Sequence, residues 1–200
     1  MAPTSKGAGS ASRTAAATTA TKRKTYRHGN VAAEALAAAV KRVETGGSAK
    51  VSLRQVAGDI GIAHRSLYNH FEDREALLVA VGAFGFGALA DAVASTKSPK
   101  DYVKAYADFA IARRHLYEVM MVQRNESMFA DKALGMHVQR LIGLSLATFG
   151  NEHASSDDNR RAVMRIWMLL HGGISLHLNG ALEPRSDEAF VAELLKIAGL

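Results

Sequence analysis

Residues 51–78 read VSLRQVAGDIGIAHRSLYNHFEDREALL. Ser52 can cap a short helix, and the apolar residues that follow have the i, i+3, i+4, i+7 spacing of one helix face: Leu53, Val56, Ala57 and Ile60. Gly61 then predicts a turn, because only glycine takes a positive φ without steric cost. A second short helix is expected from about Ala63 to His70.

The second helix is expected to have an apolar and a polar face. Ala63, Leu67 and Phe71 repeat every four residues and are expected to face inward. Arg65 and Asn69, also four residues apart, point the opposite way. Two short helices joined by a glycine turn, the second with a polar face, are typical of a helix-turn-helix. In that motif the second helix enters a major groove of DNA.

The polar face predicts direct contacts to DNA bases by His64, Arg65 and Asn69. Arginine pairs with guanine, and asparagine pairs bidentately with adenine. A second group of side chains is predicted to hold phosphates, which fixes register without reading sequence; it consists of Ser52, Ser66, Tyr68, His70 and Arg74.

The charge of the chain is concentrated in its N-terminal part. Residues 1–75 hold 12 Lys and Arg against 6 Asp and Glu, whereas residues 76–200 hold 13 of each class. The surplus of +6 therefore lies on the segment with the helix-turn-helix, as contact with nucleic acid requires.

The same stretch resembles the N-terminal domain of TetR-type (tetracycline-repressor-like) transcriptional regulators. The resemblance covers about residues 26–80. It rests on Tyr26-Arg27-His28-Gly29-Asn30, Gly61-Ile62, Ser66-Leu67-Tyr68-Asn69-His70-Phe71 and Arg74-Glu75-Ala76-Leu77-Leu78.

Two positions depart from the family pattern. Ala63 stands where the family usually has a serine that caps the recognition helix, and Arg65 stands where a small residue is frequent. Further along the chain, Trp167, His171 and Gly172 resemble the Trp-x-x-x-His-Gly motif of one C-terminal subgroup of the family.

Composition and resemblance together predict an all-α protein of about nine helices. The chain is 48% hydrophobic, with 17 Gly, only 3 Pro and no Cys, which favours helix and excludes disulfides and thiolate metal sites. We expect a disordered basic tail at 1–24 and a three-helix DNA-binding domain with the helix-turn-helix at 25–75. A larger helical domain for effector binding and dimerisation is expected at 76–200.

The N-terminal tail is low-complexity Ala, Ser, Thr and Gly, which cannot bury enough apolar surface to fold alone. Its cluster Lys22, Arg23, Lys24 and Arg27 is either a basic arm that reaches the minor groove or a solvated tail. The tail lacks the apolar core of a signal peptide. The uncharged run 76–90 is shorter than the roughly 20 residues that span a bilayer. We therefore expect a cytoplasmic protein without membrane contact.

No constellation in the sequence indicates catalysis. There is no HExxH motif and no serine elbow. His171 and His177 are six residues apart and do not share a helix face. The glycines of 82–87 fall inside a helical pattern, where close helix packing is expected rather than a phosphate loop. The sequence therefore predicts no catalytic residue, no metal site, no cofactor and no enzyme.

The C-terminal half is rich in Met and aromatic residues. Such a group is either ordinary core or the lining of a cavity, because Met adapts to varied ligands. The resemblance implies an effector cavity in this half. The expected lining is Tyr106, Phe109, Met120, Met164, Trp167, Met168 and His171.

These observations predict a homodimeric DNA-binding regulator, a repressor released from a pseudo-palindromic operator by a small apolar or amphipathic effector. The helix opened by Ser155 is apolar nearly all round, so it and the last helix are expected to form the dimer interface. The alternative is a ligand-independent architectural or partner-binding protein whose C-terminal half only dimerises.

Overall fold

The computed structural model of the chain describes residues 30–122, 131–182 and 186–200. Within these residues the fold is all-helical, with nine α-helices and no strand. The helices are α1 (Val31–Gly46), α2 (Leu53–Asp59), α3 (His64–Leu67), α4 (Arg74–Ala94), α5 (Pro99–Ala112), α6 (Arg114–Val122), α8 (Lys132–Phe149), α9 (Ser156–Leu178) and α10 (Asp187–Ile197), with a 3-10 turn η1 (Ser48–Lys50). The predicted tail at 1–24 and the start of the family motif at 26–29 lie outside the described residues.

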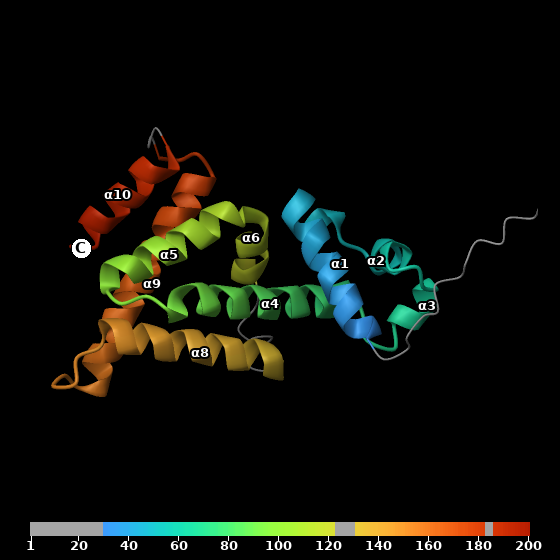
Figure 1. Ribbon diagram of the computed structural model, residues 1–200, viewed down its shortest axis with the longest axis horizontal. Helices are drawn as coiled ribbons and strands as arrows, with labels where there is room; N and C mark the ends of the chain where they lie inside the picture. The colour runs from blue at the N-terminus through green and yellow to red at the C-terminus, as the bar shows by residue number, and fades with distance from the viewer. Residues whose placement is uncertain (1–29, 123–130, 183–185) are drawn as a thin grey trace, which may run out of the picture.

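The helices form two groups along α4 (Figure 1). Helices α1, α2 and α3 pack on one another at one end, and α1 also packs on α4 and α6. Helices α5, α8, α9 and α10 gather at the other end, where α8 runs along α4. The prediction of a small helix-turn-helix unit followed by a larger helical domain is confirmed.

Helix α4 is the core helix of the molecule. It packs against α1, α5, α6 and α8, and its glycines let α6 and α8 approach closely. A Cβ at Gly85 would lie 2.6 Å from Cγ of Met120, and one at Gly87 would lie 3.0 Å from Cε1 of His137. The glycines therefore serve helix packing, as expected.

Helix α4 also has the length and composition of a membrane span, contrary to the expectation from its uncharged run. The segment Arg74–Ala94 is long and apolar enough to cross a membrane, even with the few charged residues near its ends. However, 61% of its most apolar window is buried inside the fold. That apolar surface is the core of the helical bundle.

Side-chain caps begin several of the helices. The side chains of Ser52, Asp73, Ser98 and Ser155 each accept a hydrogen bond from the backbone N–H three residues later. Asn30 stands at the N-cap of α1 but makes no side-chain capping bond. Gly47 and Gly61 have φ of 75° and 72°, so both turns need the conformational freedom of glycine.

The second helix of the motif is shorter than predicted. Helix α3 ends at Leu67, and the N–H groups of His70 and Phe71 both donate to the Leu67 carbonyl at 3.0 Å, which closes the segment as a turn. The prediction that Ala63 faces inward is wrong, because Ala63 is exposed as the N-cap of α3. Leu67 alone anchors this helix, with no exposed surface, while Phe71 is partly buried.

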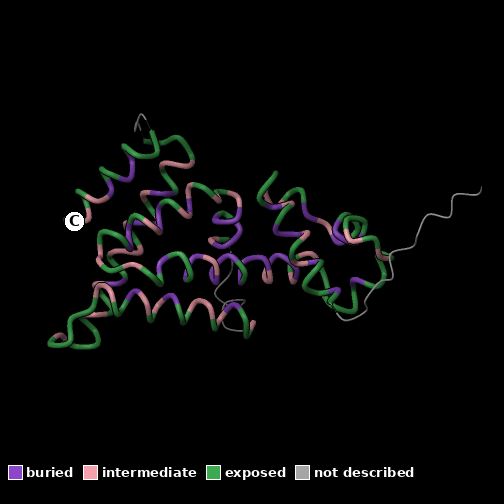
Figure 2. Tube along the Cα trace, in the orientation of Figure 1, coloured by how far each residue is buried: buried purple, intermediate pink, exposed green. Residues whose placement is uncertain are grey.

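Buried and exposed residues alternate along α9 (Figure 2), and apolar side chains occur in both groups. Val163, Leu170 and Ile174 are buried, whereas Met164 and Met168 are 48% and 61% exposed. The sequence indicates a helix that is apolar nearly all round, but within a single chain only one of its faces is buried. Its second face has no cover among the described residues.

Candidate DNA-binding surface and effector cavity

The predicted base-reading side chains lie together on the surface of α3 and the turn that follows it. His64, Arg65 and Asn69 are exposed, and the buried Leu67 holds this surface against α2 and α1. The His64 and Tyr68 rings meet edge to face with centroids 5.1 Å apart, which orders one flank. Within the described residues, Arg65 and Asn69 make no side-chain hydrogen bond or ion pair, so both are available to a ligand.

The predicted phosphate contacts divide into exposed residues and residues with structural bonds. Ser66, Tyr68 and His70 are exposed. The Ser52 hydroxyl accepts from Gln55 N at 3.3 Å and donates to Gln55 Oε1 at 3.0 Å, so it caps α2. Arg74 donates to the backbone carbonyls of Val51 and Ser48 at 3.0 and 2.8 Å. Arg74 thus ties the first residue of α4 to the loop before α2.

Of the two other arginines described in this unit, one is paired and one is not. Arg42 on α1 forms a bidentate ion pair with Asp59 on α2, and the pair lowers the pKa of the Asp59 carboxyl through a hydrogen bond. Arg54, near the start of α2, is exposed and has no ion pair among the described residues. Arg54 was not among the predicted contacts. Its position in the first turn of the helix capped by Ser52, without an acidic neighbour, is the signal that could have identified it.

A cavity of about 640 Å³ lies among α4, α6, α8 and α9. This volume suits a small-molecule ligand. The lining is mainly apolar and aromatic, with a few polar groups; it consists of Phe86, Tyr117, Glu118, Met121, Val138, Leu141, Trp167, His171, Gly172, Ser175, Leu178 and Asn179.

Only two of the seven predicted cavity residues, Trp167 and His171, line this cavity. Tyr106 is buried behind it, with its ring centroid 6.4 Å from that of His171. Met120 packs into the core against Gly85. Phe109 lies beside Arg113, whose guanidinium is 5.4 Å from the centre of its ring.

Met164 and Met168 occupy the exposed face of α9 and are not among the lining residues. Helix α9 turns Trp167 and His171 inward, and a residue one position along a helix points about 100° away. The expectation that Met168 faces the effector cavity therefore fails on geometry.

A hydrogen-bonded group lies beside the cavity. Ser145, which has no exposed surface, donates to the Leu141 carbonyl at 2.8 Å and accepts from Trp167 Nε1 at 3.2 Å. The Tyr102 hydroxyl is 2.7 Å from the same Ser145 oxygen. Burial raises the pKa of Tyr102, so its hydroxyl is protonated and donates. These bonds join α5, α8 and α9 and fix the orientation of the Trp167 ring.

A second polar pair faces the cavity itself. The Tyr117 hydroxyl on α6 is 2.6 Å from Nδ1 of His171 on α9. Burial raises the pKa of Tyr117 to about 12 and lowers the pKa of His171. Both groups are therefore neutral near pH 7, and the cavity presents uncharged hydrogen-bonding groups at this point.

Comparison with family models covers both parts of the chain. Residues 35–81 match the model described as bacterial regulatory proteins, tetR family, and residues 100–197 match the tetracyclin repressor-like C-terminal domain. Together the two models span more than half of the chain. The chain belongs to the TetR family.

Solved structures show the same fold. A protein of unknown function from Rhodococcus sp. RHA1 is 25% identical, with a TM-score of 0.66 over 86% of this chain and 95% of that one. A possible TetR family transcriptional regulator from Streptomyces coelicolor A3(2) is 15% identical, with a TM-score of 0.56 over 84% and 88%. The fatty acid degradation regulator FadR from Bacillus halodurans is 15% identical, with a TM-score of 0.59 over 86% and 96%. A comparison with curated proteins finds no match.

The Trp-x-x-x-His-Gly residues of this TetR-family chain are brought to one place. Trp167, His171 and Gly172 all line the cavity, with Trp167 about one helical turn before His171 on α9. A Cβ at Gly172 would meet no atom within 4 Å. Packing within the chain therefore does not require glycine there.

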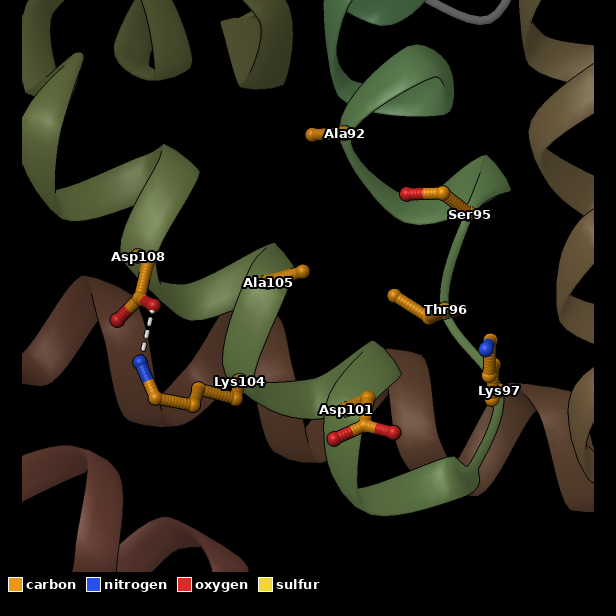
Figure 3. Close-up of a pocket in the computed structure, with 8 residues that line it drawn as sticks. All are labelled: Ala92, Ser95, Thr96, Lys97, Asp101, Lys104, Ala105 and Asp108. Atoms are coloured by element: carbon orange, nitrogen blue, oxygen red, sulfur yellow. Dashed lines mark hydrogen bonds and ion pairs between the residues drawn. The ribbon is translucent and has the colours of Figure 1, made fainter.

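A second hollow, of about 400 Å³, lies between the end of α4 and α5 (Figure 3). Three of its four charged side chains have partners, and the fourth, Lys97, is exposed. Lys104 forms an ion pair with Asp108 at 2.5 Å, and Asp101 accepts from the Ser98 hydroxyl at 2.7 Å as part of the α5 cap. This hollow is a polar surface groove, and the cavity beside Trp167 is the candidate ligand site.

The cavity residues that were not predicted come mainly from α4, α6 and α8, and the others lie on the C-terminal part of α9 and at its cap. Phe86, Met121, Val138 and Leu141 are ordinary apolar residues in helical patterns, and no local signal separates a cavity wall from the core. Tyr117 differs, because a buried tyrosine needs a hydrogen-bond partner. A tyrosine on one helix and a histidine on another could have been proposed as a pair.

Proposed function

We propose that this TetR-family chain is a cytoplasmic, homodimeric transcriptional repressor, and not an enzyme. A small apolar or amphipathic effector that binds the cavity releases it from a pseudo-palindromic operator. The observation that carries the proposal is the joining of two features by α4. An unpaired, exposed polar face lies on α3, and a cavity with a mainly apolar lining lies in the larger domain. The Trp-x-x-x-His-Gly subgroup is proposed with it, because the three motif residues line that cavity.

In the DNA-bound state α3 lies in the major groove, with His64, Arg65 and Asn69 on base edges. Ser66, Tyr68 and His70 hold phosphates from the flanks. We add Arg54 to the phosphate contacts, since it is exposed and lacks an acidic partner among the described residues. Ser52 and Arg74 keep a proposed phosphate role beside their structural bonds.

The dimer forms through the exposed face of α9 together with α10. Met164, Met168 and Leu176 leave 48%, 61% and 48% of their surface exposed along one side of α9, and Ile197 at the end of α10 is 65% exposed. Burial of this stripe against its symmetry mate gives a four-helix interface. Two recognition helices are then about 34–36 Å apart or somewhat more, as successive major grooves require.

The dimer is tested by Met168→Glu, with Gln139→Glu on the exposed side of α8 as a matched control. We expect the first variant to be monomeric by light scattering and to lose tight operator binding, with unchanged circular dichroism. The control should remain a dimer. A dimeric Met168→Glu protein would contradict this interface.

The effector acts through α4 and α6. Tyr117, Glu118 and Met121 of α6 line the cavity, while α6 also packs on α1 of the DNA-binding unit. Arg113, just before α6, forms an ion pair with Glu44 near the end of α1 at 2.5 Å. A ligand that favours one position of α6 therefore changes the position of the DNA-binding unit, and coupling of about 1–3 kcal/mol is ordinary.

The test begins with an operator obtained by selection from random duplexes. Fluorescence anisotropy then measures operator affinity with and without small apolar ligands. We expect ligands that enter the cavity to weaken binding by roughly 5–150-fold. Operator affinity that stays constant while ligands demonstrably bind would favour a ligand-independent protein whose larger domain only dimerises.

A further inference from the structure

Three aromatic side chains pack together at the wall of the cavity: the ring centroid of Tyr106 is 6.2 Å from that of Tyr117 and 6.4 Å from that of His171. Tyr106 is fully enclosed, and burial, followed by the interactions with Tyr117, raises its pKa well above the ordinary value. A phenol hydroxyl is a stronger donor than a neutral imidazole N–H, and an imidazole nitrogen is a stronger acceptor than a phenol oxygen, so Tyr117 donates to His171 Nδ1 in their 2.6 Å contact.

This direction fixes the tautomer of His171. The Tyr117 proton lies in this hydrogen bond, so His171 Nδ1 is the acceptor. A neutral imidazole with an accepting Nδ1 carries its proton on Nε2. His171 therefore has one remaining donor, the Nε2–H group.

The Nε2–H group faces the cavity without a partner. His137 Nδ1 is the one fully buried side-chain N or O atom among the described residues that lacks a hydrogen bond. His171 Nε2 also has no hydrogen bond among those residues, but it is not a fully buried atom, so it keeps some accessible surface. Because His171 lines the cavity, that surface belongs to the cavity wall. A ligand in the cavity meets a neutral donor at this point.

The charges around the cavity disfavour an anion. Among the described lining residues none is Lys or Arg, and the one ionisable carboxyl is that of Glu118. A buried carboxylate without a cation loses its hydration and gains no compensating partner. The Glu118 side chain is 52% exposed and lies 3.2 Å from His115 Nδ1. It therefore gives an amine only the weak attraction of a solvated ion pair.

We propose that the effector is a neutral, mainly apolar molecule with a carbonyl-type hydrogen-bond acceptor, which the Nε2–H group of His171 binds. Tyr117 is a positioning residue that holds His171 in the donating tautomer. The inference rests on the proposed function only in assigning the cavity to an effector. It adds the chemical class that the cavity accepts.

The experiment uses the full-length protein and three probes of matched chain length: methyl decanoate, decanoate and decylamine, each below its micellar concentration. Trp167 is the only tryptophan of the chain and lines the cavity, so its fluorescence reports binding without a label. We expect methyl decanoate to bind at least about tenfold more tightly than decanoate and more tightly than decylamine. Tightest binding by decanoate or decylamine, equal binding by all three, or no binding by any of them overturns the inference.

Variants identify the group that makes the selection. His171→Phe should lower ester affinity by about three- to tenfold, and His171→Gln, which keeps a donor, should lower it less. Tyr117→Phe should reduce the preference for the ester while retaining aromatic packing. Because His171→Phe leaves a buried tyrosine hydroxyl unpaired, the double variant Tyr117→Phe/His171→Phe removes both partners and supplies a stable protein for the same titration. Unchanged ester affinity in the double variant would exclude His171 as the donor.

Operator binding of each variant separates this inference from the proposed function. Ester selectivity with constant operator affinity would support the cavity chemistry and contradict effector release. Release by a carboxylate would support effector release and contradict the cavity chemistry.

Discussion

The recognition helix and the cavity use polar side chains in opposite ways. On α3 and in the turn that follows it, the side chains of Arg65 and Asn69 are exposed and have no partner among the described residues. Around the cavity, Tyr117 is bonded to His171, and Trp167 is bonded to Ser145. The polar groups of the α3 surface are free to bond a ligand, whereas most polar groups around the cavity are already hydrogen-bonded within the protein.

The difference follows from solvation. Exposed donors on α3 bond to water in the free protein and exchange water for DNA on binding, so no internal partner is needed. Donors near the cavity are removed from water by folding, and each would cost about 1–3 kcal/mol if left unpaired. The α3 surface therefore depends on one buried anchor, whereas the cavity depends on a network across several helices. The two regions should fail differently when their supports are removed.

Loss of the α3 anchor should have the largest effect. Leu67 has no exposed surface and is the one fully buried side chain of α3. Leu67→Ala should lower the free energy of unfolding by about 2–5 kcal/mol, because it removes buried apolar contacts and leaves a cavity. Urea denaturation measures this, and operator affinity should fall with it. Tyr68→Ala, at a neighbour that is 49% exposed, is the control and should cost less. An equal loss in both variants would show that Leu67 is not the anchor.

Removal of the Ser145 hydroxyl, the acceptor beside the cavity, should have the second-largest effect on stability. Ser145→Ala leaves the donors of Tyr102 and Trp167 without their acceptor, at about 1–3 kcal/mol for each group left unpaired. Thr148→Ala is a matched control, since Thr148 also donates to the carbonyl four residues earlier, at 2.9 Å, but accepts no side-chain donor. Thermal and urea denaturation should separate the two variants by at least about 1 kcal/mol. Equal stabilities would mean that the Ser145 network adds nothing.

The same contrast explains what the sequence could predict. The α3 surface is a matter of local helical periodicity, so the positions of Arg65, Leu67 and Asn69 follow from their spacing. Ala63 was misplaced because α3 closes after one turn, and the repeat of four does not extend back to its cap. Capping residues such as Ser98 and Ser155 were predictable, since the pattern and the bond lie within four residues.

The cavity lining was not predictable in the same way. Its walls come from four helices, and whether Phe86 or Met120 faces a void depends on how those helices pack. Met120 fills the space left by Gly85, a contact between residues 35 positions apart that no local pattern indicates. Trp167 and His171 were found through a family motif, whereas Met168 was misassigned because a helix that is apolar nearly all round gives no inward direction.

Base reading by Arg65 should show a moderate and selective effect. Arg65→Ala should cost about 1–3 kcal/mol on the selected operator and relax preference at one base pair. Arg54→Ala should instead weaken all duplexes alike and reduce the salt slope by about one. Arg160→Ala, at an exposed position of α9, is the control and should leave DNA affinity unchanged. Anisotropy on operator and scrambled duplexes across salt concentrations makes the comparison. Unchanged specific affinity in Arg65→Ala would show that this face does not read bases.

The smallest expected effect is a gain at the cap of α3. Ala63 has an extended backbone with φ −64° and ψ 133°, typical of an N-cap, but has no side-chain oxygen for the first N–H groups of the helix. Ala63→Ser supplies that oxygen at an exposed position, where the hydroxyl costs no burial. We expect the free energy of unfolding to rise by about 0.5–1 kcal/mol.

Operator affinity should rise by less than about fivefold in Ala63→Ser, because an ordered α3 loses less conformational freedom on binding. Ala63→Gly separates capping from loss of the methyl group. Glycine is tolerated at an N-cap but has no side-chain oxygen to accept from the first N–H groups of the helix. Urea denaturation and anisotropy of the three proteins complete the test. Tighter operator binding without a gain in stability would point to a direct contact of the new hydroxyl with phosphate. No change in either quantity would mean that α3 is already fully ordered by Leu67.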